Sequence, residues 1–540
     1  MFKRLAIATA LGVVGASAAG VTYPVPTQVP SGAVKLDSTP LGVSFEFFMW
    51  PSYMTNITPP LQCLDHFSTL YGKKIPIRIG GTTQDRATYD PDFQGYVSYH
   101  VDNRLDAPMN LTYGPMLFDL IPKFGAETML GFNRGNDNIT NTLEAVMEAK
   151  ARAGHNLGAI ELGNEPDLYY SIWNKPIAVA PWNNSQEGSS AAEWAQAFIN
   201  RWKSPLPILS AGAYAVPIPL YEDYPDTNYL INEAYNASVK AGTKSYCTHL
   251  YALSSGTTLG TEMNHLRTVS DLSHFVDKIA TAKSINRPYI IGETGFHGLD
   301  EEMDATFGGA LQVLDKTLLA LSIGIERLYY HQGTINQAFF NWWSDNQVEA
   351  PFYGAWMAGL ALQGADHIVA SDDGTNSFAQ YILYKRGKPF KAVLINTDYY
   401  SGTGKRNSTT FTLKGLKSAK VKALRMIAPS SDVTTSLEQA NPSNELTIGE
   451  GPGCRPRSLI RCCPWLNQAT TPREPELYIR NVQGGIAVYM YHASSILYYD
   501  LSFYLSSKLL VGSINRTTTA PDTLQNGSVQ PAVYSRATSL

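Results

Sequence analysis

Ile160-Glu161-Leu162-Gly163-Asn164-Glu165-Pro166-Asp167 is the stretch of this sequence that decides the fold. Its apolar start is typical of a buried strand, which ends at the polar pair Asn164 and Glu165 before Pro166 begins a turn. A second run, Tyr289-Ile290-Ile291-Gly292-Glu293-Thr294-Gly295, has the same arrangement of a strand, a terminal glutamate and a glycine-containing loop. Polar groups at the carboxyl ends of separate strands are typical of a barrel of alternating strands and helices, whose site lies at that face.

The chain between residues 36 and 365 alternates short apolar or β-branched runs with helical patterns. The candidate strands are Gly42–Phe48, Ile75–Gly80, Thr128–Asn133, Ala159–Glu165, Ile208–Ala213, Ser245–Tyr251, Tyr289–Glu293 and Gly324–His331. The candidate helices are Asn141–Ala153, Ala191–Trp202, Asn264–Ser284 and Ala305–Leu321. Because eight strands is the number that closes a (β/α)₈ TIM barrel, the sequence predicts an α/β barrel domain over residues 36–365.

After about Ala365 the helical periodicity stops and strand-like alternation begins. The alternating runs are Phe378–Lys385, Phe390–Asn396, Thr409–Leu413 and Ala419–Met426. They predict an antiparallel β-sandwich over residues 366–491, closed by a strand within Gly484–Tyr491. Residues 21–35 either add a strand to this sandwich or only lead into the barrel, and residues 492–540 form a tail without an assigned packed structure.

The composition is typical of a folded extracellular protein. Hydrophobic residues make up 44% of the 540 residues and charged residues 16%, and 42 basic against 46 acidic residues give a net charge of −4. No strongly basic region provides the electrostatic footprint of a nucleic-acid-binding protein. Five cysteines do not form a disulfide framework in so long a chain, and Cys454, Cys462 and Cys463 lack a second ligand group at zinc spacing. The sequence predicts neither a metal site nor a cofactor, and leaves the oligomeric state open.

The start of the chain predicts a secreted protein. Met1–Arg4 is basic, Leu5–Val14 is a run of apolar and small residues, and Gly15–Ala18 offers small residues for cleavage, so residues 1–18 are expected to be a signal peptide. The run is too short to span a membrane, and no later segment is a membrane span. Eight Asn-x-Ser/Thr sequons, typical of a secreted protein with N-glycans, begin at Asn56, Asn110, Asn138, Asn183, Asn236, Asn407, Asn515 and Asn526.

Glu165 and Glu293 end the fourth and seventh candidate strands, on opposite sides of the expected barrel mouth. Hydrolysis of a glycosidic bond needs such a pair, one group to protonate the leaving oxygen and one to attack carbon or activate water. A separation of about 5–5.5 Å lets the second carboxylate attack the sugar directly, which gives net retention. We therefore expect Glu293 to be the ionised nucleophile and Glu165 the acid/base, protonated until the glycosyl-enzyme forms.

Further segments accompany the two glutamate motifs. They are Ile77-Arg78-Ile79-Gly80-Gly81-Thr82-Thr83-Gln84-Asp85, Tyr89-Asp90-Pro91, Thr248-His249-Leu250-Tyr251 and Ile323-Gly324-Ile325-Glu326. Together these motifs resemble glycoside hydrolase family 79, which contains the fungal and bacterial β-glucuronidases and the mammalian heparanases. The likeness covers about residues 36–365. It implies a barrel, a β-sandwich formed from both chain ends, and exo-release of glucuronic acid.

The resemblance also implies roles for single residues. It makes Glu165 the proton donor and Glu293 the nucleophile, with Asn164 holding the sugar 2-hydroxyl and Tyr251 donating a hydrogen bond to the nucleophile. The residues expected to contact hydroxyls of the terminal sugar are Glu46 and Thr82.

Two polar residues near strand ends, His249 and Arg78, have more than one interpretation. His249 either binds the substrate or is a satisfied barrel histidine, and Gln332 is a further substrate-binding candidate. Arg78 precedes its strand end, which favours an internal ion pair beneath the site over a contact with a sugar carboxylate.

Recognition of the sugar carboxylate is where this chain departs from the family. Family glucuronidases bind that carboxylate with glycine amides after the nucleophile and with a tyrosine after strand eight. Gly295 and Gly298 would supply the amides here. Where the tyrosine is expected the sequence has Gln337-Ala338-Phe339-Phe340-Asn341-Trp342-Trp343, so either Tyr330 or Tyr329 supplies the hydroxyl, or the carboxylate is held otherwise.

The sequence leaves four functions to compare. The first is a secreted, retaining exo-β-glucuronidase for glycans that carry terminal glucuronic or 4-O-methylglucuronic acid. The second is a heparanase-like endo-glucuronidase, which needs a basic cleft that the candidate site loops do not provide. The third is a retaining β-glycosidase for a neutral sugar, and the fourth is a carbohydrate-binding protein without catalysis.

Overall fold

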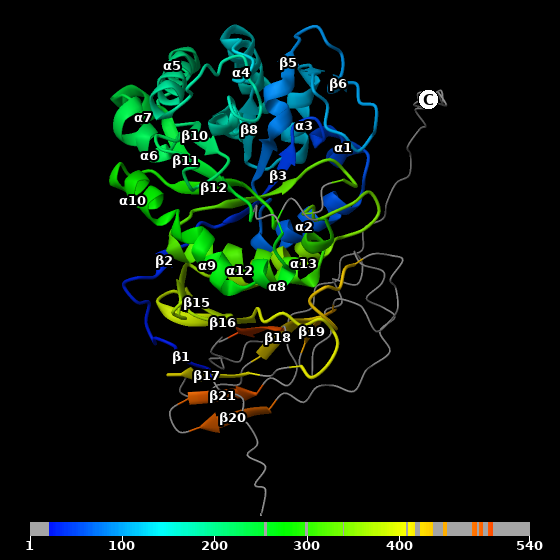
Figure 1. The fold of residues 1–540 in the computed structure, drawn as a ribbon, viewed down its shortest axis with the longest axis vertical. Helices are drawn as coiled ribbons and strands as arrows, with labels where there is room; N and C mark the ends of the chain where they lie inside the picture. The colour runs from blue at the N-terminus through cyan, green and yellow to red at the C-terminus, as the bar shows by residue number, and fades with distance from the viewer. Residues whose placement is uncertain are drawn as a thin grey trace, which may run out of the picture. The chain divides into compact units, whose positions relative to one another are not determined.

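The computed structural model describes residues 21–252, 256–297, 301–337, 340–406, 409–415, 422–435, 447–450, 478–482, 485–489 and 495–500. The expected signal peptide, Gly298, and the sequons at Asn407, Asn515 and Asn526 lie outside these residues, as do Cys454, Cys462 and Cys463. Figure 1 shows the course of the chain.

Eight parallel strands close into a barrel, as the sequence predicts, and the last strand pairs with the first. In chain order they are β3 (Leu41–Glu46), β4 (Ile77–Gly80), β8 (Thr128–Phe132), β9 (Leu157–Leu162), β10 (Leu209–Tyr214), β11 (Thr243–Leu250), β12 (Tyr289–Thr294) and β13 (Leu328–Gln332). Each corresponds to one candidate strand, with ends shifted by a few residues. The largest shift is at β13, because Gly324 ends the preceding helix in the left-handed conformation, with φ of 110°.

Helices surround these strands (Figure 1). They are α1 (Trp50–Thr55), α2 (Pro59–Tyr71), α3 (Met116–Phe124), α4 (Ile139–Ala153), α5 (Asn184–Trp202), α6 (Thr227–Tyr229), α7 (Ala237–Gly242), α8 (Leu259–Glu262), α9 (His265–Ser273), α10 (Val276–Ser284), α11 (Glu301–Asp304), α12 (Phe307–Ile323) and α13 (Ala350–Leu362). Within the described ranges, each helix is too short or too polar to cross a lipid bilayer.

One candidate helix is divided in the structure. The run predicted over Asn264–Ser284 forms α9 and α10, which are separated by His274 and Phe275. Phe275 is buried and packs edge-on against Tyr289 of β12. The break therefore places an aromatic ring against the barrel.

A small sheet is inserted after β4, which is followed by the short 3-10 turn Thr82–Arg86. Its strands are β5 (Ala87–Tyr89), β7 (Leu111–Tyr113) and β6 (Val97–Tyr99). Tyr89 and Tyr113 pack together and contact Phe118 of α3, so aromatic side chains attach the insertion to the barrel.

A β-sandwich follows the barrel, as predicted. The larger sheet has the order β19 (Thr447–Glu450), β18 (Lys422–Ile427), β22 (Ser495–Asp500), β16 (Lys388–Asn396), β15 (Phe378–Lys385), β14 (His367–Ala370) and β2 (Val34–Lys35). The smaller sheet has the order β1 (Val21–Pro24), β17 (Thr410–Lys414), β21 (Gly485–Tyr489) and β20 (Tyr478–Val482). Both ends of the chain therefore contribute strands, and β21 lies where the sequence predicts a closing strand.

β22 lies beyond the sandwich boundary that the sequence suggests at residue 491. It pairs antiparallel with β16 on one side and with β18 on the other, so it is an internal strand of the larger sheet. We propose that the sandwich domain extends to Asp500 and that residues 21–35 belong to it.

β15 and β16 are buried on both faces. Ile382 and Tyr384 pack with Phe411 and Leu413 between the two sheets. The alternate residues Tyr381 and Leu383 belong instead to the core shared with the barrel helices. Because side chains alternate along a strand, one sheet can join the sandwich core to the barrel core.

α12 and α13 occupy the space between barrel strands and sandwich, and their sequences fit this position. Almost every residue of both helices is buried. α13 is apolar all round, which is typical of a helix buried on more than one side, whereas α12 also buries the charged side chains of Asp315 and Lys316. α12 contacts α13, β14 and β15.

A buried ionic cluster connects the barrel helices to the sandwich. His265 of α9 lies with Nδ1 2.8 Å from Asp315 of α12 and Nε2 3.0 Å from Asp372, which follows β14. Tyr381 of β15 also donates to Asp315, at 2.6 Å. Burial opposes the charged imidazolium, but the two aspartates outweigh burial and raise the pKa of His265 to about 10.

The cluster makes stability depend on pH. A raised pKa in the folded state adds stability that is complete below the ordinary histidine pKa of about 6.5 and is lost as pH rises through the folded-state value. We expect the urea midpoint of the protein to fall between pH 7 and pH 10, and His265→Gln to remove most of that fall. Exposed His100→Gln is the control; equal midpoint curves for His265→Gln and the unsubstituted protein would contradict the prediction.

Candidate active site

Alternate residues of the barrel strands bring polar side chains into the barrel interior near its carboxyl-end mouth. Along a strand every second side chain points to the same face. The inward polar positions, judged from their mutual contacts, are Ser44, Glu46, Arg78, Glu161, Cys247, His249, Glu293 and His331. They come from β3, β4, β9, β11, β12 and β13.

Glu165 and Glu293 face each other across this interior. One carboxylate oxygen of each lies within 4.8 Å of the other, and a ring nitrogen of His249 belongs to the same group. Glu293 is within β12, whereas Glu165 follows β9 in a left-handed conformation with φ of 52°. Pro166 disfavours the right-handed helical conformation at Glu165. Local strain of this kind is frequent where a side chain must be aimed at a site.

The two carboxyl groups have opposite proton affinities. Burial and the neighbouring charge of Glu293 raise the pKa of Glu165. Burial also opposes ionisation of Glu293, but His331 and Arg78, with a hydrogen bond from Tyr251, outweigh burial and lower its pKa. Glu165 therefore keeps its proton while Glu293 is ionised, the arrangement that pairs an acid with a nucleophile.

Arg78 is the cation beneath the pair. Its fully buried guanidinium donates to Glu293 at 2.6 Å and to both oxygens of Glu161, the shortest at 2.6 Å. It also donates to Ser44 at 3.0 Å and to Asn164 at 2.8 Å. This is the internal ion pair that the sequence favours for Arg78, and it additionally holds the nucleophile candidate. All of its side-chain nitrogens are engaged by the protein.

Replacing Arg78 by methionine is expected to lower the free energy of unfolding by about 3–5 kcal/mol, the usual loss when one partner of a buried pair is removed. Glu161 and Glu293 would then be buried without the guanidinium, so the pKa of Glu293 rises and stability recovers partly as pH falls. Urea unfolding at pH 5 and pH 8 tests both statements.

The matched control for this variant is Arg152→Met, which breaks the exposed pairs with Glu148 and Asp119. We expect only a small change, because exposed pairs contribute little. Equal losses for the two variants, or no difference between the two pH values, would contradict the role of Arg78.

Glu46 lies at the end of β3 within a set of short contacts. The backbone N–H of Thr83 donates to its carboxylate at 2.8 Å, and the Thr83 hydroxyl donates at 2.5 Å. His331 Nε2 lies 3.1 Å from the second oxygen. A Cβ at Gly81 would lie 2.5 Å from this oxygen, so the approach of Glu46 requires glycine there. Thr82, the neighbour for which the resemblance implies a sugar contact, is half-buried beside this group.

The remaining candidates from the sequence surround the two glutamates. Tyr251 donates to Glu293 at 2.9 Å, the contact that the resemblance implies. His249 Nδ1 lies 3.2 Å from Glu165, and burial lowers the pKa of His249 to about 4, so the ring is neutral. Asn164 accepts from Arg78 through its side chain, while its backbone N–H donates to Asp85 at 2.7 Å.

Tyr330 and Gln332 do not lie where the sequence analysis places them. The Tyr330 hydroxyl donates to the Val313 backbone carbonyl of α12 at 3.0 Å, and the side-chain Oε1 of Gln332 accepts from the Trp342 backbone N–H at 2.7 Å. Both point out of the barrel because His331 between them points in. Tyr330 and Gln332 therefore do not line the site, and the substrate contacts that the sequence analysis expects from them are wrong.

Tyr329, the other tyrosine considered for the carboxylate, points inward but lies in a deeper layer of the barrel. Its hydroxyl accepts from Arg327 at 3.2 Å, and its ring packs with Met129 and Ile290. Of the proposed carboxylate contacts within the described residues, Gly295 stays a prediction: it follows β12 and lies against Tyr251 and Phe340.

His331, like Ser44 and Glu161, is a residue of this group that the sequence analysis does not name as a substrate-binding candidate. It is buried, and its two nitrogens lie near Ser44 and Glu46, with Nδ1 also 3.6 Å from Glu293. Burial opposes its charge, but Glu293 and Glu46 raise its pKa. Its position directly before Gln332 at a strand end was the available signal.

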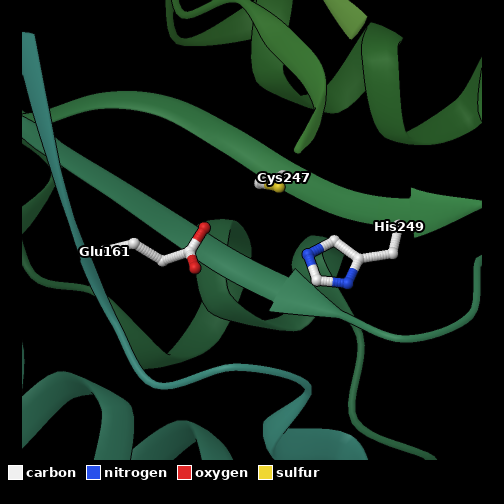
Figure 2. Close-up of side chains that lie close together, drawn as sticks. All are labelled: Glu161, Cys247 and His249. Atoms are coloured by element: carbon white, nitrogen blue, oxygen red, sulfur yellow. The ribbon is translucent and has the colours of Figure 1, made fainter. Parts of the chain in front are cut away.

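Glu161, Cys247 and His249 form a second compact group, shown in Figure 2. The carboxylate and the imidazole point toward each other from separate strands. Both oxygens of Glu161 accept from Arg78, however, and burial raises the pKa of the Cys247 thiol, which stays protonated. A metal cation would have to share the Glu161 carboxylate with the Arg78 guanidinium. These side chains are therefore better explained as the binding partners and neighbours of Arg78 than as metal ligands.

Comparisons with known proteins agree with this architecture. A family model for the glycosyl hydrolase family 79 C-terminal β domain matches residues 380–449. A β-glucuronidase of Aspergillus niger is 28% identical over 444 residues, which cover 75% of this chain and 80% of that protein. A β-glucuronidase of Neurospora crassa is 25% identical over 491 residues, covering 76% of this chain and 87% of that protein.

A solved structure provides the strongest of these likenesses. It is the 4-O-α-L-rhamnosyl-β-D-glucuronidase of Fusarium oxysporum in complex with Rha-GlcA, which is 31% identical. The match has a TM-score of 0.76 and covers 89% of this chain and 100% of the Fusarium oxysporum chain. With this identity over the full length of a relative, the chain belongs to glycoside hydrolase family 79 and is a glycoside hydrolase.

Proposed function

We propose that this glycoside hydrolase is a retaining exo-β-glucuronidase that releases terminal glucuronic or 4-O-methylglucuronic acid from glycans. Glu293 attacks the anomeric carbon while Glu165 protonates the leaving oxygen, and water then attacks the glycosyl-enzyme with Glu165 as base. The observation that carries the proposal is the pair of carboxylate oxygens within 4.8 Å, one on a group that holds its proton and one on an ionised group.

The spacing supports retention. An inverting enzyme needs its carboxyl groups about 6.5–9.5 Å apart, since a water molecule must fit between one carboxylate and the sugar. Direct attack needs about 5–5.5 Å. Because one oxygen of Glu165 and one of Glu293 lie within 4.8 Å, Glu293 can attack the sugar carbon directly, and there is little room for the water that an inverting enzyme activates.

The names of the relatives support a uronic acid as the sugar. Both fungal relatives are β-glucuronidases, and the Fusarium oxysporum structure contains a disaccharide of rhamnose and glucuronic acid. A neutral sugar remains the alternative for this chain.

The surface beside Glu165 supports uncharged leaving groups over sulfated chains. Two loops form this surface. Asp167 of the loop after β9, which includes Glu165, accepts hydrogen bonds from Ala215 and Tyr224 of the loop after β10, so the two loops are held together. The exposed large hydrophobic side chains of these loops are Tyr170, Ile172, Val179, Ile218, Leu220 and Tyr221, and the exposed charged residues of the second loop, Glu222 and Asp223, are acidic. A sulfated chain would call for lysine and arginine there.

The test compares an aryl β-glucuronide with the matching aryl β-glucoside, and adds the glucuronide carrying a 4-O-rhamnosyl group. We expect the free glucuronide to give the highest kcat/KM and a product of retained configuration by NMR. A preference for the glucoside would overturn the glucuronide assignment, and an inverted first product would overturn the mechanism. A preference for the rhamnosylated compound would make rhamnosyl-glucuronide the substrate.

We further propose secretion and N-glycosylation. The basic and apolar start of the chain is typical of a signal peptide. Of the described sequons, Asn56, Asn110, Asn138 and Asn236 are exposed, as glycan attachment requires. Amino-terminal sequencing of the protein from culture medium, and its mass before and after glycan removal, test these statements.

A further inference from the structure

Lys316 is a buried cation that the mechanism above does not use. It lies on α12, is 1% exposed, and donates to the Gly295 carbonyl at 2.5 Å and to the Thr294 hydroxyl at 3.4 Å. Thr294 and Gly295 directly follow Glu293. An ammonium group is therefore fixed behind the loop that begins at the nucleophile.

Neighbouring contacts hold the same loop. The Phe296 carbonyl accepts from the Ala252 backbone at 3.0 Å, and the His297 backbone N–H donates to Asp304 at 2.5 Å. A Cβ at Gly295 would lie 2.8 Å from the Tyr251 ring and 2.9 Å from Phe340. Gly295 therefore lies between the tyrosine that binds the nucleophile and the lysine.

The cations that contact Glu293 are not available to a substrate. Arg78 donates to Glu161, Glu293, Asn164 and Ser44, as described above. The nitrogens of His331 lie near Ser44 and Glu46. A carboxylate on the sugar is therefore held by groups other than Arg78 and His331.

The planar trans peptide between Gly295 and Phe296 connects Lys316 to the site. In such a peptide the C=O and N–H bonds point in opposite directions. Since Lys316 binds the carbonyl, the Phe296 N–H is directed away from α12. A charge on the carbonyl side polarises the peptide and strengthens its N–H as a donor.

We propose that Lys316 is a positioning residue for substrate charge: through the Gly295–Phe296 peptide it favours a sugar that carries a carboxylate over a neutral sugar. The inference rests on the proposed glucuronidase function and deepens it. A purely structural lysine would support acidic and neutral sugars equally.

The surroundings keep Lys316 charged in acidic solution. Burial lowers its pKa to about 8, and the acidic groups of Asp271, Asp304 and Glu262 oppose this shift while Arg267 adds to it. The ammonium form is therefore present at pH 6, where the following test is made.

The test uses Lys316→Met with Lys391→Met as a matched control. Lys391 is also a buried lysine that donates to backbone carbonyls, those of Leu360 and Gln363, but it belongs to the sandwich. The measurements are kcat/KM for the aryl glucuronide and glucoside, and inhibition constants for glucaro-1,4-lactone, which carries a carboxylate, and gluconolactone, which does not.

For Lys316→Met we expect about a 10- to 100-fold weaker binding of the acidic lactone and a similar fall in glucuronide kcat/KM, the range for losing one charge-assisted hydrogen bond. Constants for the neutral compounds should change less than about threefold, and Lys391→Met should alter only thermal stability. Equal losses for acidic and neutral compounds, or no loss for either, would overturn the inference.

A second variant guards against misfolding. If Lys316→Met does not fold, Lys316→Gln, which can still donate to the Gly295 carbonyl without charge, should show the same selective loss, measured at a temperature at which thermal unfolding shows the variant to be folded. If the unsubstituted enzyme itself prefers the glucoside, the proposed function fails; if it prefers the glucuronide and the variants keep that preference, only the role of Lys316 fails.

Discussion

Glu293→Ala is expected to lower kcat for an aryl β-glucuronide by about 10⁴-fold or more, because the group that attacks the sugar carbon is removed. The space left beside Arg78 and Tyr251 suits a small anion, since both donate to the missing carboxylate. Added azide should therefore restore part of the rate. The C1–N bond then forms from the nucleophile side while the C1–O bond breaks, which gives an inverted glycosyl azide.

Product configuration separates this prediction from a general loss of structure. Azide added to Glu165→Ala should instead attack the glycosyl-enzyme and give a glycosyl azide of retained configuration. A rescued Glu293→Ala whose azide product has retained configuration, or near-native turnover without azide, would remove Glu293 from the role of nucleophile.

Glu165→Gln is expected to slow substrates with poor leaving groups by about 10²- to 10⁴-fold, the usual contribution of a general acid. Glycosylation from a dinitrophenyl glucuronide should be much less affected, because that leaving group departs without a proton. A plot of log kcat/KM against leaving-group pKa should become steeper in the variant.

The pH profile gives a second test of Glu165. Activity needs a protonated Glu165 and an ionised Glu293. Because the pKa of Glu165 is raised and that of Glu293 is lowered, kcat/KM should be bell-shaped, wide, and extended on its alkaline side beyond the usual carboxyl range. Glu165→Gln should lose the alkaline limb. A variant that keeps that limb, with unchanged leaving-group dependence, would exclude Glu165 as the acid.

The barrel and the two glutamates could be predicted from the sequence because their signals are local. Each strand is a short apolar run, and Glu165 and Glu293 both stand where such a run ends. Which of two successive polar residues points inward could not be predicted in the same way. Barrel strands are buried on both faces, so apolar alternation does not mark the inner face. Local pattern therefore does not distinguish Gln332 from its neighbour His331, which is the residue that contacts Glu46.

Two other features needed long-range information. β22 pairs with β16 and β18, and the strand is recognisable only when these distant partners are placed beside it. Lys316 lies in a helix that the sandwich and the barrel bury together, whereas a lone helical lysine in a sequence favours an exposed position. In both cases tertiary structure decides the environment, and local pattern does not.

The place of β22 bears on how the chain folds as it leaves the ribosome. The barrel strands and helices are all synthesised before residue 365, but the larger sheet keeps a gap between β16 and β18 until residues 495–500 emerge. During that interval the edges of β16 and β18 are open to pairing with other chains, which favours aggregation and binding by chaperones. Yield of the protein in a heterologous host should therefore depend on the last strand more than on the catalytic half.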